Sequence, residues 1–264
     1  MTDLQNVFED LNTESEEIDE MVAGLDASRW RTPTPAPDWT IAHQVGHLTF
    51  IFNLAGTAAA DPDTFQKMVA GAQKDFSGAV NAALAHYMDE PSAMLARWRA
   101  ERAAAVKSLA AFPPDQVVPW LVRPLPPAIL ACAGIMEVFG HGQDIADALG
   151  IRLVRTDRIR HLTGFAVLVW DFGYLSRGLT PPDVQFRFEL TAPSGELWTY
   201  GPADAAQRIT GPAEDFCLLV TRRRHRDDLS LVATGEDADR WLDIAQAYRG
   251  PAGPGRRPGQ FAKA

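Results

Sequence analysis

The first 150 residues of the chain carry the apolar spacing of amphipathic α-helices. Between Leu4 and Leu25, apolar residues recur at helical intervals and acidic residues fill much of the opposite face. Three later segments also read as helices: 41–59, 91–112 and 128–149. Gly150 follows the last of them, at the position where glycine commonly ends a helix. Four helices joined in this way favour a four-helix bundle.

The pattern changes near residue 182. Residues 184–190 alternate strictly between apolar and polar side chains, as a strand with one buried face does. A strand at 197–200 is expected after a Ser194–Gly195 turn, and another at 229–233. The remaining helices are predicted at three places: 157–177, 212–223 and 236–249.

These elements predict an α+β protein with two domains. The first, over residues 1–181, is a helical bundle with one extra helix. The second, over residues 182–264, is a small α+β domain, and the boundary is expected in the proline-containing segment just before it. From Gly250 the chain lacks periodicity and is rich in Pro, Gly and Arg, so we expect an extended tail.

Composition excludes several classes of protein. The net charge of −9 argues against a dedicated nucleic-acid binder, which would carry a basic surface. No apolar run is long enough to span a membrane, and the N-terminus lacks the pattern of a secretory signal. The two cysteines, Cys132 and Cys217, form no paired motif, which fits a reducing compartment. We therefore expect a cytoplasmic protein.

Glu137 and His141 are the main candidates for chemistry. Their i, i+4 spacing puts a carboxylate and an imidazole on one face of a helix. His47, in an earlier predicted helix, is the third candidate. One carboxylate and two imidazoles leave coordination positions open, which is typical of a catalytic metal site. Such a donor set favours Zn²⁺.

The residues alone leave alternatives open around this group. His43 lies one turn before His47 and is a second candidate ligand, and His47 could instead be a hydrogen-bonded core residue. Asp144 follows His141 on the same face, and either Asp144 or Asp147 could orient the imidazole or pair with a surface arginine. The basic run 222–226 ends a predicted helix, where it could be solvated or could capture an anion.

Taken in order, these motifs resemble a known family. The order Asp38-Trp-Thr, His47-Leu, Glu137-x-x-x-His141 and Asp144 is similar to the DinB-like metal-binding bundle. More narrowly, it resembles mycothiol-dependent maleylpyruvate isomerase and related actinobacterial thiol S-transferases. The segment 209–223 is similar to the small C-terminal domain of that family, so the resemblance covers nearly the whole chain. A still closer likeness is to an actinobacterial metal-binding branch with a helix over 241–246 and a Pro/Gly/Arg tail.

The resemblance implies a function and a set of site residues. The metal triad of the family falls on His47, Glu137 and His141, and its site arginine falls on Arg223, with the register open by one within 222–224. A metal-dependent isomerase or S-transferase is implied, with mycothiol or another small thiol as cosubstrate and a small, carboxylate-bearing electrophile as substrate. Arg223 would hold that carboxylate. The segment 113–127 and the tail depart from the family pattern, so the substrate of the isomerase does not carry over.

Two other functions are compatible with the same residues. One is a metal-dependent hydrolase that uses metal-bound hydroxide, which a requirement for thiol would distinguish. The other is a non-catalytic metal- or ligand-binding stress protein, against which three intact ligands argue. The sequence leaves open the substrate, the thiol, the native metal and the choice between monomer and homodimer.

Overall fold

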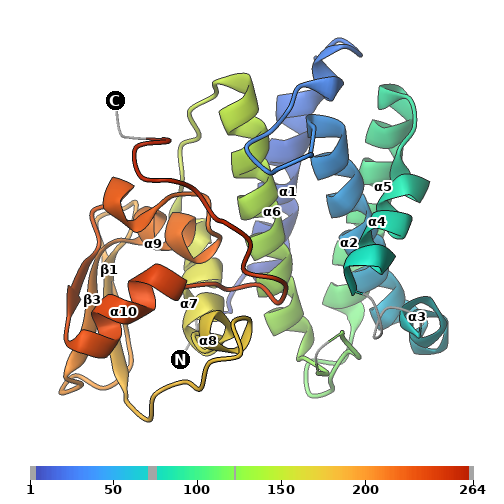
Figure 1. Cartoon of the computed structure of the whole chain (residues 1–264). Helices are drawn as coiled ribbons and strands as arrows, with labels where there is room; N and C mark the ends of the chain where they lie inside the picture. Colours follow the sequence, from blue (N-terminus) through green and yellow to red (C-terminus); the bar gives the residue numbers. More distant parts are fainter. Residues whose placement is uncertain (1–3, 71–75, 122, 262–264) are drawn as a thin grey trace. The chain divides into compact units, whose positions relative to one another are not determined.

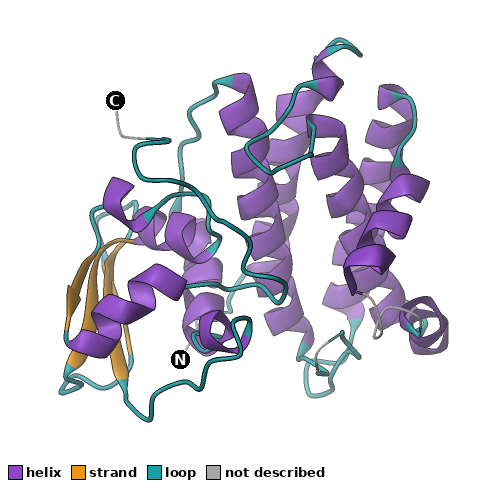
Figure 2. Ribbon diagram, in the orientation of Figure 1, coloured by secondary structure: helices purple, strands orange, loops and turns teal. Residues whose placement is uncertain are grey.

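The computed structural model of the chain describes residues 4–70, 76–121 and 123–261 (Figure 1). It divides into two compact units, one over Leu4–Leu153 and one from Val154 onward. The first unit contains helices, and all four strands of the described residues lie in the second (Figure 2). The α+β class predicted from the sequence is therefore confirmed. Among the described helices, none combines the length and the apolar character needed to cross a lipid bilayer.

Four long helices form the core of the first unit: α1 (Val7–Val22), α2 (Ile41–Ala60), α5 (Pro91–Ala111) and α6 (Pro127–Leu149). Helix α2 packs against α5 and α6, and α1 packs against the same two helices, so the four form the predicted bundle (Figure 1). Helix α6 begins with a proline and ends at Gly150, which adopts a left-handed φ of 69°. The sequence did not predict three short elements: η1 (Arg29–Arg31), α3 (Pro62–Val69) and α4 (Phe76–Tyr87).

A glycine lets α2 approach α5 closely. A Cβ atom on Gly56 would lie 3.0 Å from the Cα atom of Ala105, which is tighter than ordinary van der Waals contact. The two backbones therefore meet at this point because neither residue has a bulky side chain. This contact holds one side of α2, the helix that carries His43 and His47.

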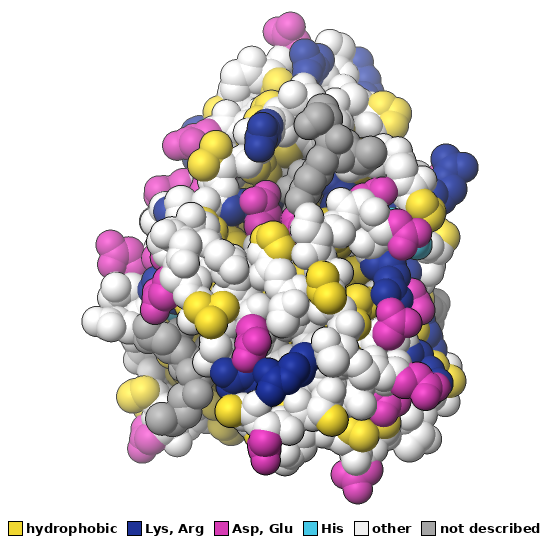
Figure 3. All heavy atoms as spheres, turned by 90° about the vertical axis from the view of Figure 1, so that its left-hand side faces the viewer, with side chains coloured by type: hydrophobic (Ala, Val, Ile, Leu, Met, Phe, Trp, Pro, Cys, Tyr) yellow, Lys and Arg dark blue, Asp and Glu magenta, His cyan; other side chains and the backbone are white. Residues whose placement is uncertain are grey.

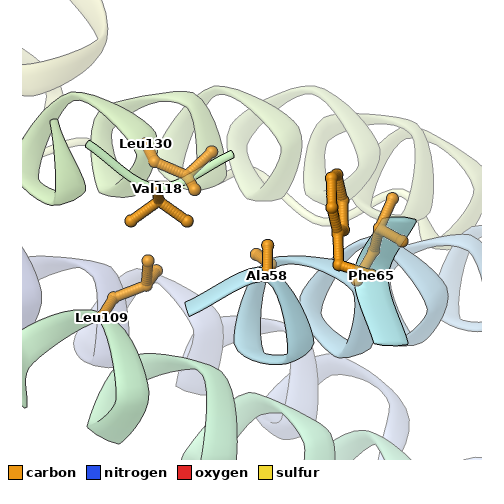
Figure 4. Close-up of a cluster of buried hydrophobic side chains, with 7 residues drawn as sticks. Ala58, Phe65, Leu109, Val118 and Leu130 are labelled. Atoms are coloured by element: carbon orange, nitrogen blue, oxygen red, sulfur yellow. The ribbon is translucent and has the colours of Figure 1, made fainter. Parts of the chain in front are cut away.

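The proline-rich connection between α5 and α6 contributes to the core. Its residues Val118 and Leu125 exchange two backbone hydrogen bonds of 2.8 and 3.0 Å, so the connection folds back on itself. Val118 is fully buried and belongs to a cluster with Leu109 of α5 and Leu130 of α6 (Figure 4). The segment is thus a packed part of the bundle, and burial of these apolar side chains stabilises it.

The second unit is built on a four-stranded sheet in the order β2-β1-β3-β4. Strand β1 pairs with β2 in the antiparallel sense and with β3 in the parallel sense, and β3 pairs with β4 in the antiparallel sense. On the buried face, Phe188 of β1 contacts Phe216 and Trp241, whose rings stack on each other. The elements are η2 (Asp157–Ile159), α7 (Arg160–Leu168), α8 (Phe172–Leu175), β1 (Phe186–Thr191), β2 (Leu197–Tyr200), β3 (Gln207–Pro212), α9 (Ala213–Val220), η3 (Arg226–Asp228), β4 (Val232–Thr234) and α10 (Glu236–Ile244).

The helix predicted over 157–177 is interrupted. Helix α7 ends at Leu168, and the carbonyl oxygen of Trp170 accepts a hydrogen bond of 2.8 Å from the indole Nε1 of Trp241 in α10. This tertiary contact satisfies a carbonyl that a continuous helix would have used. Helix α7 also packs on α9, so the unit with the sheet begins at Val154, earlier than the boundary expected at 182.

Strand β3 lies inside the sheet although the sequence predicted no strand there. Its Gly211 and Pro212 suggest a turn, but Ile209 is fully buried between β1 and β4. The strand expected at 229–233 is shorter and is shifted to Val232–Thr234. The two last helices also end earlier than predicted, at Val220 and Ile244.

Candidate metal centre

His47, Glu137 and His141 come together inside the helical unit. His47 lies on α2 and the other two lie on α6, and these helices pack against each other. One ligand atom of each residue lies within 4.8 Å of the other two. Oε2 of Glu137 is 3.5 Å from Nε2 of His47 and 3.3 Å from Nε2 of His141. Both imidazoles therefore turn the same ring nitrogen toward one carboxylate oxygen.

These three side chains are largely, but not fully, buried. The exposed fractions are 12% for His47, 14% for His141 and 21% for Glu137. Burial by itself raises the pKa of Glu137, but hydrogen bonds and charge interactions with His141 and His47 outweigh it. The pKa of Glu137 is therefore held well below its usual range, and the side chain is a carboxylate at neutral pH.

His43 forms part of the N-terminal cap of α2. Its Nδ1 accepts a hydrogen bond of 3.2 Å from the backbone N–H of Thr40 and lies 2.7 Å from the hydroxyl of the same residue. This reciprocal contact satisfies polar groups at the helix N-terminus that would otherwise lack partners. His43 is not part of the cluster of His47, Glu137 and His141.

Trp39, in the loop before α2, covers the two histidines of the cluster. Its ring stacks on His141 with a centroid distance of 5.8 Å and an interplanar angle of 21°, and lies 5.3 Å from the ring of His47. The hydroxyl and the backbone N–H of Thr34 both donate to the carbonyl oxygen of Trp39. The loop is thus held so that an aromatic ring packs on both imidazoles. The sequence singled out this tryptophan only as part of a motif.

Gln44 is a buried residue at the site that the sequence did not predict. Its Oε1 lies 2.5 Å from Nδ1 of His141, and its Nε2 donates to Oγ1 of Thr34 at 2.8 Å. The same Nε2 lies 3.4 Å from Oδ2 of Asp144. The i, i+3 spacing from Gln44 to His47 was the available signal, since it puts both residues on one face of α2.

Asp144 lies fully buried on α6, near the cluster. The sequence left two roles open for it: it could orient His141 or pair with a surface arginine. A hydrogen-bonded path from Asp144 to His141 runs through the amide group of Gln44. The first of these roles is therefore compatible with the structure, and Asp144 would orient His141 through the amide group of Gln44.

Arg223 lies in the second unit, in the turn after α9. The preceding Arg222 adopts a left-handed φ of 58°, so the helix ends before the arginine run. Nη1 of Arg223 donates to the carbonyl oxygen of Thr221 at 2.5 Å. Arg223 is not among the residues that line a cavity of about 210 Å³ in this unit. The polar residues that line it are Arg222, Arg224, His225, Arg226, Asp243 and Arg256. The role of Arg223 stays a prediction.

The donor set of the cluster suits a divalent metal ion. Glu137 supplies a negative oxygen, and two imidazoles direct Nε2 toward it. Nδ1 of His47 is buried and has no hydrogen-bond partner among the described residues, so this ring has only Nε2 in a polar contact. Two nitrogens and one oxygen are ligands that Zn²⁺ accepts, and three protein ligands leave a position for a further group.

A helical bundle with this cluster, followed by a small α+β unit, defines the protein as a DinB-like bundle with an appended domain. Residues 11–146 match the family described as the mycothiol maleylpyruvate isomerase N-terminal domain. The chain belongs to this family, which confirms the resemblance found in the sequence. Residues 182–234, in the second unit, match a family described as wyosine base formation.

Relatives extend the similarity over the whole chain. The uncharacterized protein Rv0036c of Mycobacterium tuberculosis strain H37Rv is 44% identical over 248 residues, which cover 94% of this chain and 96% of the relative. The uncharacterized protein MT0041 of Mycobacterium tuberculosis strain CDC 1551 is similar to the same extent. The similarity to these relatives therefore extends over both units of this chain.

Solved structures with the same fold are more distant. A crystal structure of the mycothiol-dependent maleylpyruvate isomerase has a TM-score of 0.58 and 14% sequence identity, and it covers 87% of this chain and 92% of that chain. A histidine-to-alanine mutant of that enzyme gives a TM-score of 0.55, again at 14% identity, with 82% and 88% covered. At this identity the similarity establishes the fold alone.

Proposed function

We propose that this protein is a metal-dependent enzyme that uses a small thiol, of the mycothiol type, to act on a small electrophile that bears a carboxylate. The observation that carries the proposal is the convergence of Nε2 of His47, Nε2 of His141 and Oε2 of Glu137. Membership in a family named for a mycothiol-dependent isomerase supports the thiol. The reaction is an isomerisation or an S-transfer.

The three residues of the cluster would hold the metal. A bound divalent ion such as Zn²⁺ supplies a positive charge that favours the thiolate form of a thiol at neutral pH. Glu137 is already ionised, so it offsets part of that charge without giving up a proton. His47 and His141 would contribute neutral nitrogen donors, and Trp39 packs on both of their rings.

The thiolate would attack an electrophilic carbon of the substrate. A sulfur–carbon bond forms as the adjacent double bond gives up its electron pair to the conjugated acceptor. In an isomerase, rotation about the resulting single bond and expulsion of the thiolate regenerate the double bond, whereas in a transferase a proton is taken up and the adduct is kept. Arg223 would hold the carboxylate of the substrate, since a guanidinium forms a planar, bidentate contact with it.

The metal site also suits a hydrolase, because three ligands and partial exposure would admit water as well as a thiol. A titration of mycothiol into zinc-loaded and zinc-free protein, in two buffers of different ionisation enthalpy, tests the choice. We expect tighter binding to the zinc-loaded protein with release of a proton. Cysteine and glutathione serve as comparison thiols. Equal binding of all three thiols with and without zinc would overturn the proposed use of a thiol and favour the hydrolase.

A further inference from the structure

The amide group of Gln44 connects a buried carboxylate to a candidate metal ligand. Gln44 and Asp144 are both fully buried, and the amide reaches from Oδ2 of Asp144 to Nδ1 of His141. We infer that Gln44 is a positioning residue that keeps a hydrogen on Nδ1 of His141 and thereby leaves Nε2 as the nitrogen that faces the cluster. This inference rests on the proposed metal site, but its first test does not require a metal.

The orientation of the amide is determined at its nitrogen end. The two ends of a glutamine amide have nearly the same shape, so the hydrogen-bond partners decide which is which. Asp144 presents a carboxylate oxygen, which accepts, so the amide nitrogen must face it. The hydroxyl of Thr34 donates its one hydrogen to the carbonyl oxygen of Trp39, so toward Gln44 it accepts. Both neighbours therefore require the amide nitrogen on their side.

The hydrogen on Nδ1 of His141 follows from this orientation. With the nitrogen of Gln44 directed at Asp144, the oxygen of the amide faces Nδ1 of His141 at 2.5 Å. A carbonyl oxygen only accepts, so Nδ1 must carry a hydrogen. The other nitrogen, Nε2, is then the atom available to a metal ion, and it lies 3.3 Å from Oε2 of Glu137. In the metal-free protein Nε2 can keep a hydrogen of its own and donate it to that carboxylate. A ring without a hydrogen on Nδ1 would bring two lone pairs together at Nδ1.

His47 provides an internal comparison. Its Nδ1 is buried and has no hydrogen-bond partner among the residues that the structure describes. Its ring is held by aromatic contacts, with centroids 5.3 Å from Trp39 and 4.5 Å from His141. Substitution of Gln44 should therefore affect the hydrogen on Nδ1 of His141 and leave His47 unaltered.

The test uses protein labelled with ¹⁵N in histidine, without metal, at neutral pH. In the wild type, we expect Nδ1 of His141 to carry a hydrogen that exchanges slowly with water. Gln44→Met removes the acceptor at nearly constant size, and we expect this hydrogen to lose its protection from exchange. Gln143→Met is the matched control, because Gln143 is a buried glutamine of α6 that donates to Asp147 instead.

Zinc affinity, measured by competition with a chelator, is the second readout. We expect Gln44→Met to weaken zinc binding about 10- to 100-fold, as loss of a group that orients a metal-bound histidine does, and Gln143→Met to bind like the wild type. A wild-type His141 without a hydrogen on Nδ1 would overturn the inference even if no variant folds. So would a Gln44→Met protein with the wild-type protection of that hydrogen and wild-type affinity. If the protection is lost as expected but no form binds metal, Gln44 keeps its positioning role and the proposed metal function fails.

Discussion

Nε2 of His47 lies 3.5 Å from Oε2 of Glu137, although the two residues come from different helices of the bundle. The contact joins α2 to α6 at the point where His141 also directs its Nε2 to the same oxygen. Three polar groups in a helical core are costly unless each has a partner. Their convergence on a single carboxylate oxygen is the physical reason for placing a metal ion there, since a cation would satisfy all three at once.

Removal of any one of the three ligands should remove most of the bound metal. We expect His47→Ala, Glu137→Gln and His141→Ala each to lose most of the zinc that the wild type retains, because two remaining protein ligands bind weakly. Elemental analysis of the purified variants, beside circular dichroism to verify folding, measures this. His43→Ala is the matched control, since His43 contacts Thr40 at the start of the helix and should leave the metal in place. Full zinc content in all three ligand variants would refute the site.

A methyl group at Gly56 should destabilise the bundle. The added Cβ would lie 3.0 Å from Cα of Ala105, and a backbone atom cannot move aside as a flexible side chain can. We expect Gly56→Ala to lower the free energy of unfolding by about 1–3 kcal/mol. Denaturant unfolding of the metal-free protein gives the value. Gly24→Ala is the comparison, because a Cβ there meets nothing within 4 Å, and stability should change by less than about 1 kcal/mol. An equal effect of both substitutions would contradict the close contact.

Local spacing was enough to predict the four long helices and the shared face of Glu137 and His141, because both follow from the periodicity of one helix. The position of His47 beside these two residues depends on how α2 packs on α6, which periodicity does not specify. The resemblance to a family is what assigned His47 to the same metal site. The sequence did not predict Gln44 as a site residue because its partner Asp144 lies 100 residues away in the chain. A polar residue in a helix is also ordinarily expected to be exposed to solvent.

The sheet was harder to predict than the bundle for a related reason. Strand β3 contains Gly211 and Pro212, which locally favour a turn, yet it pairs with β1 in the parallel sense and with β4. Its place in the sheet comes from these non-local pairings and from the burial of Ile209. The interruption after Leu168 likewise depends on a hydrogen bond from Trp241, which no local pattern reveals.

The ion pair between Asp19 and Arg99 should make stability depend on pH. Arg99 donates two hydrogen bonds, of 2.5 and 2.9 Å, to the carboxylate of Asp19 and so connects α1 to α5. The hydrogen bond and the charge of Arg99 lower the pKa of Asp19 against the opposing effect of burial. A lowered pKa in the folded state means stabilisation that is complete above the unfolded pKa of about 3.9 and is lost as the pH falls below it.

Asp19→Asn should therefore cost stability at pH 7 and progressively less as the pH falls below about 4. Because half of Arg99 is exposed, with 51% of its side chain accessible, we expect only about 0.5–1 kcal/mol. Denaturant midpoints at pH 7 and pH 3.5 measure the difference. Asp26→Asn, at an exposed position on the loop after α1, should show no such pH dependence. A cost that is the same at both pH values would show that the ion pair is not its source.

Substitution of Arg223 tests whether the second unit takes part in substrate binding. In the structure its guanidinium contacts the carbonyl oxygen of Thr221, two residues earlier, so loss of the side chain should cost only a few tenths of a kcal/mol in stability. If Arg223 holds a substrate carboxylate, Arg223→Ala should lower kcat/KM about 10- to 100-fold, the value of a charge-assisted contact of about 1.5–3 kcal/mol. Arg223→Lys should restore only part of the activity, because an ammonium group cannot form the planar fork.

Arg222→Ala and Arg224→Ala, measured under the same conditions, decide the register within the arginine run. Both residues line the cavity of the second unit, whereas Arg223 does not. We expect the three variants to keep their zinc, since none of them belongs to the cluster on α2 and α6. A loss of kcat/KM in Arg223→Ala alone supports the residue that the family resemblance indicates. A loss of kcat/KM confined to Arg222→Ala or Arg224→Ala would indicate that the substrate carboxylate binds at the cavity, because the guanidinium groups of these two residues line it. Full activity in all three variants would remove the arginine run from substrate binding altogether.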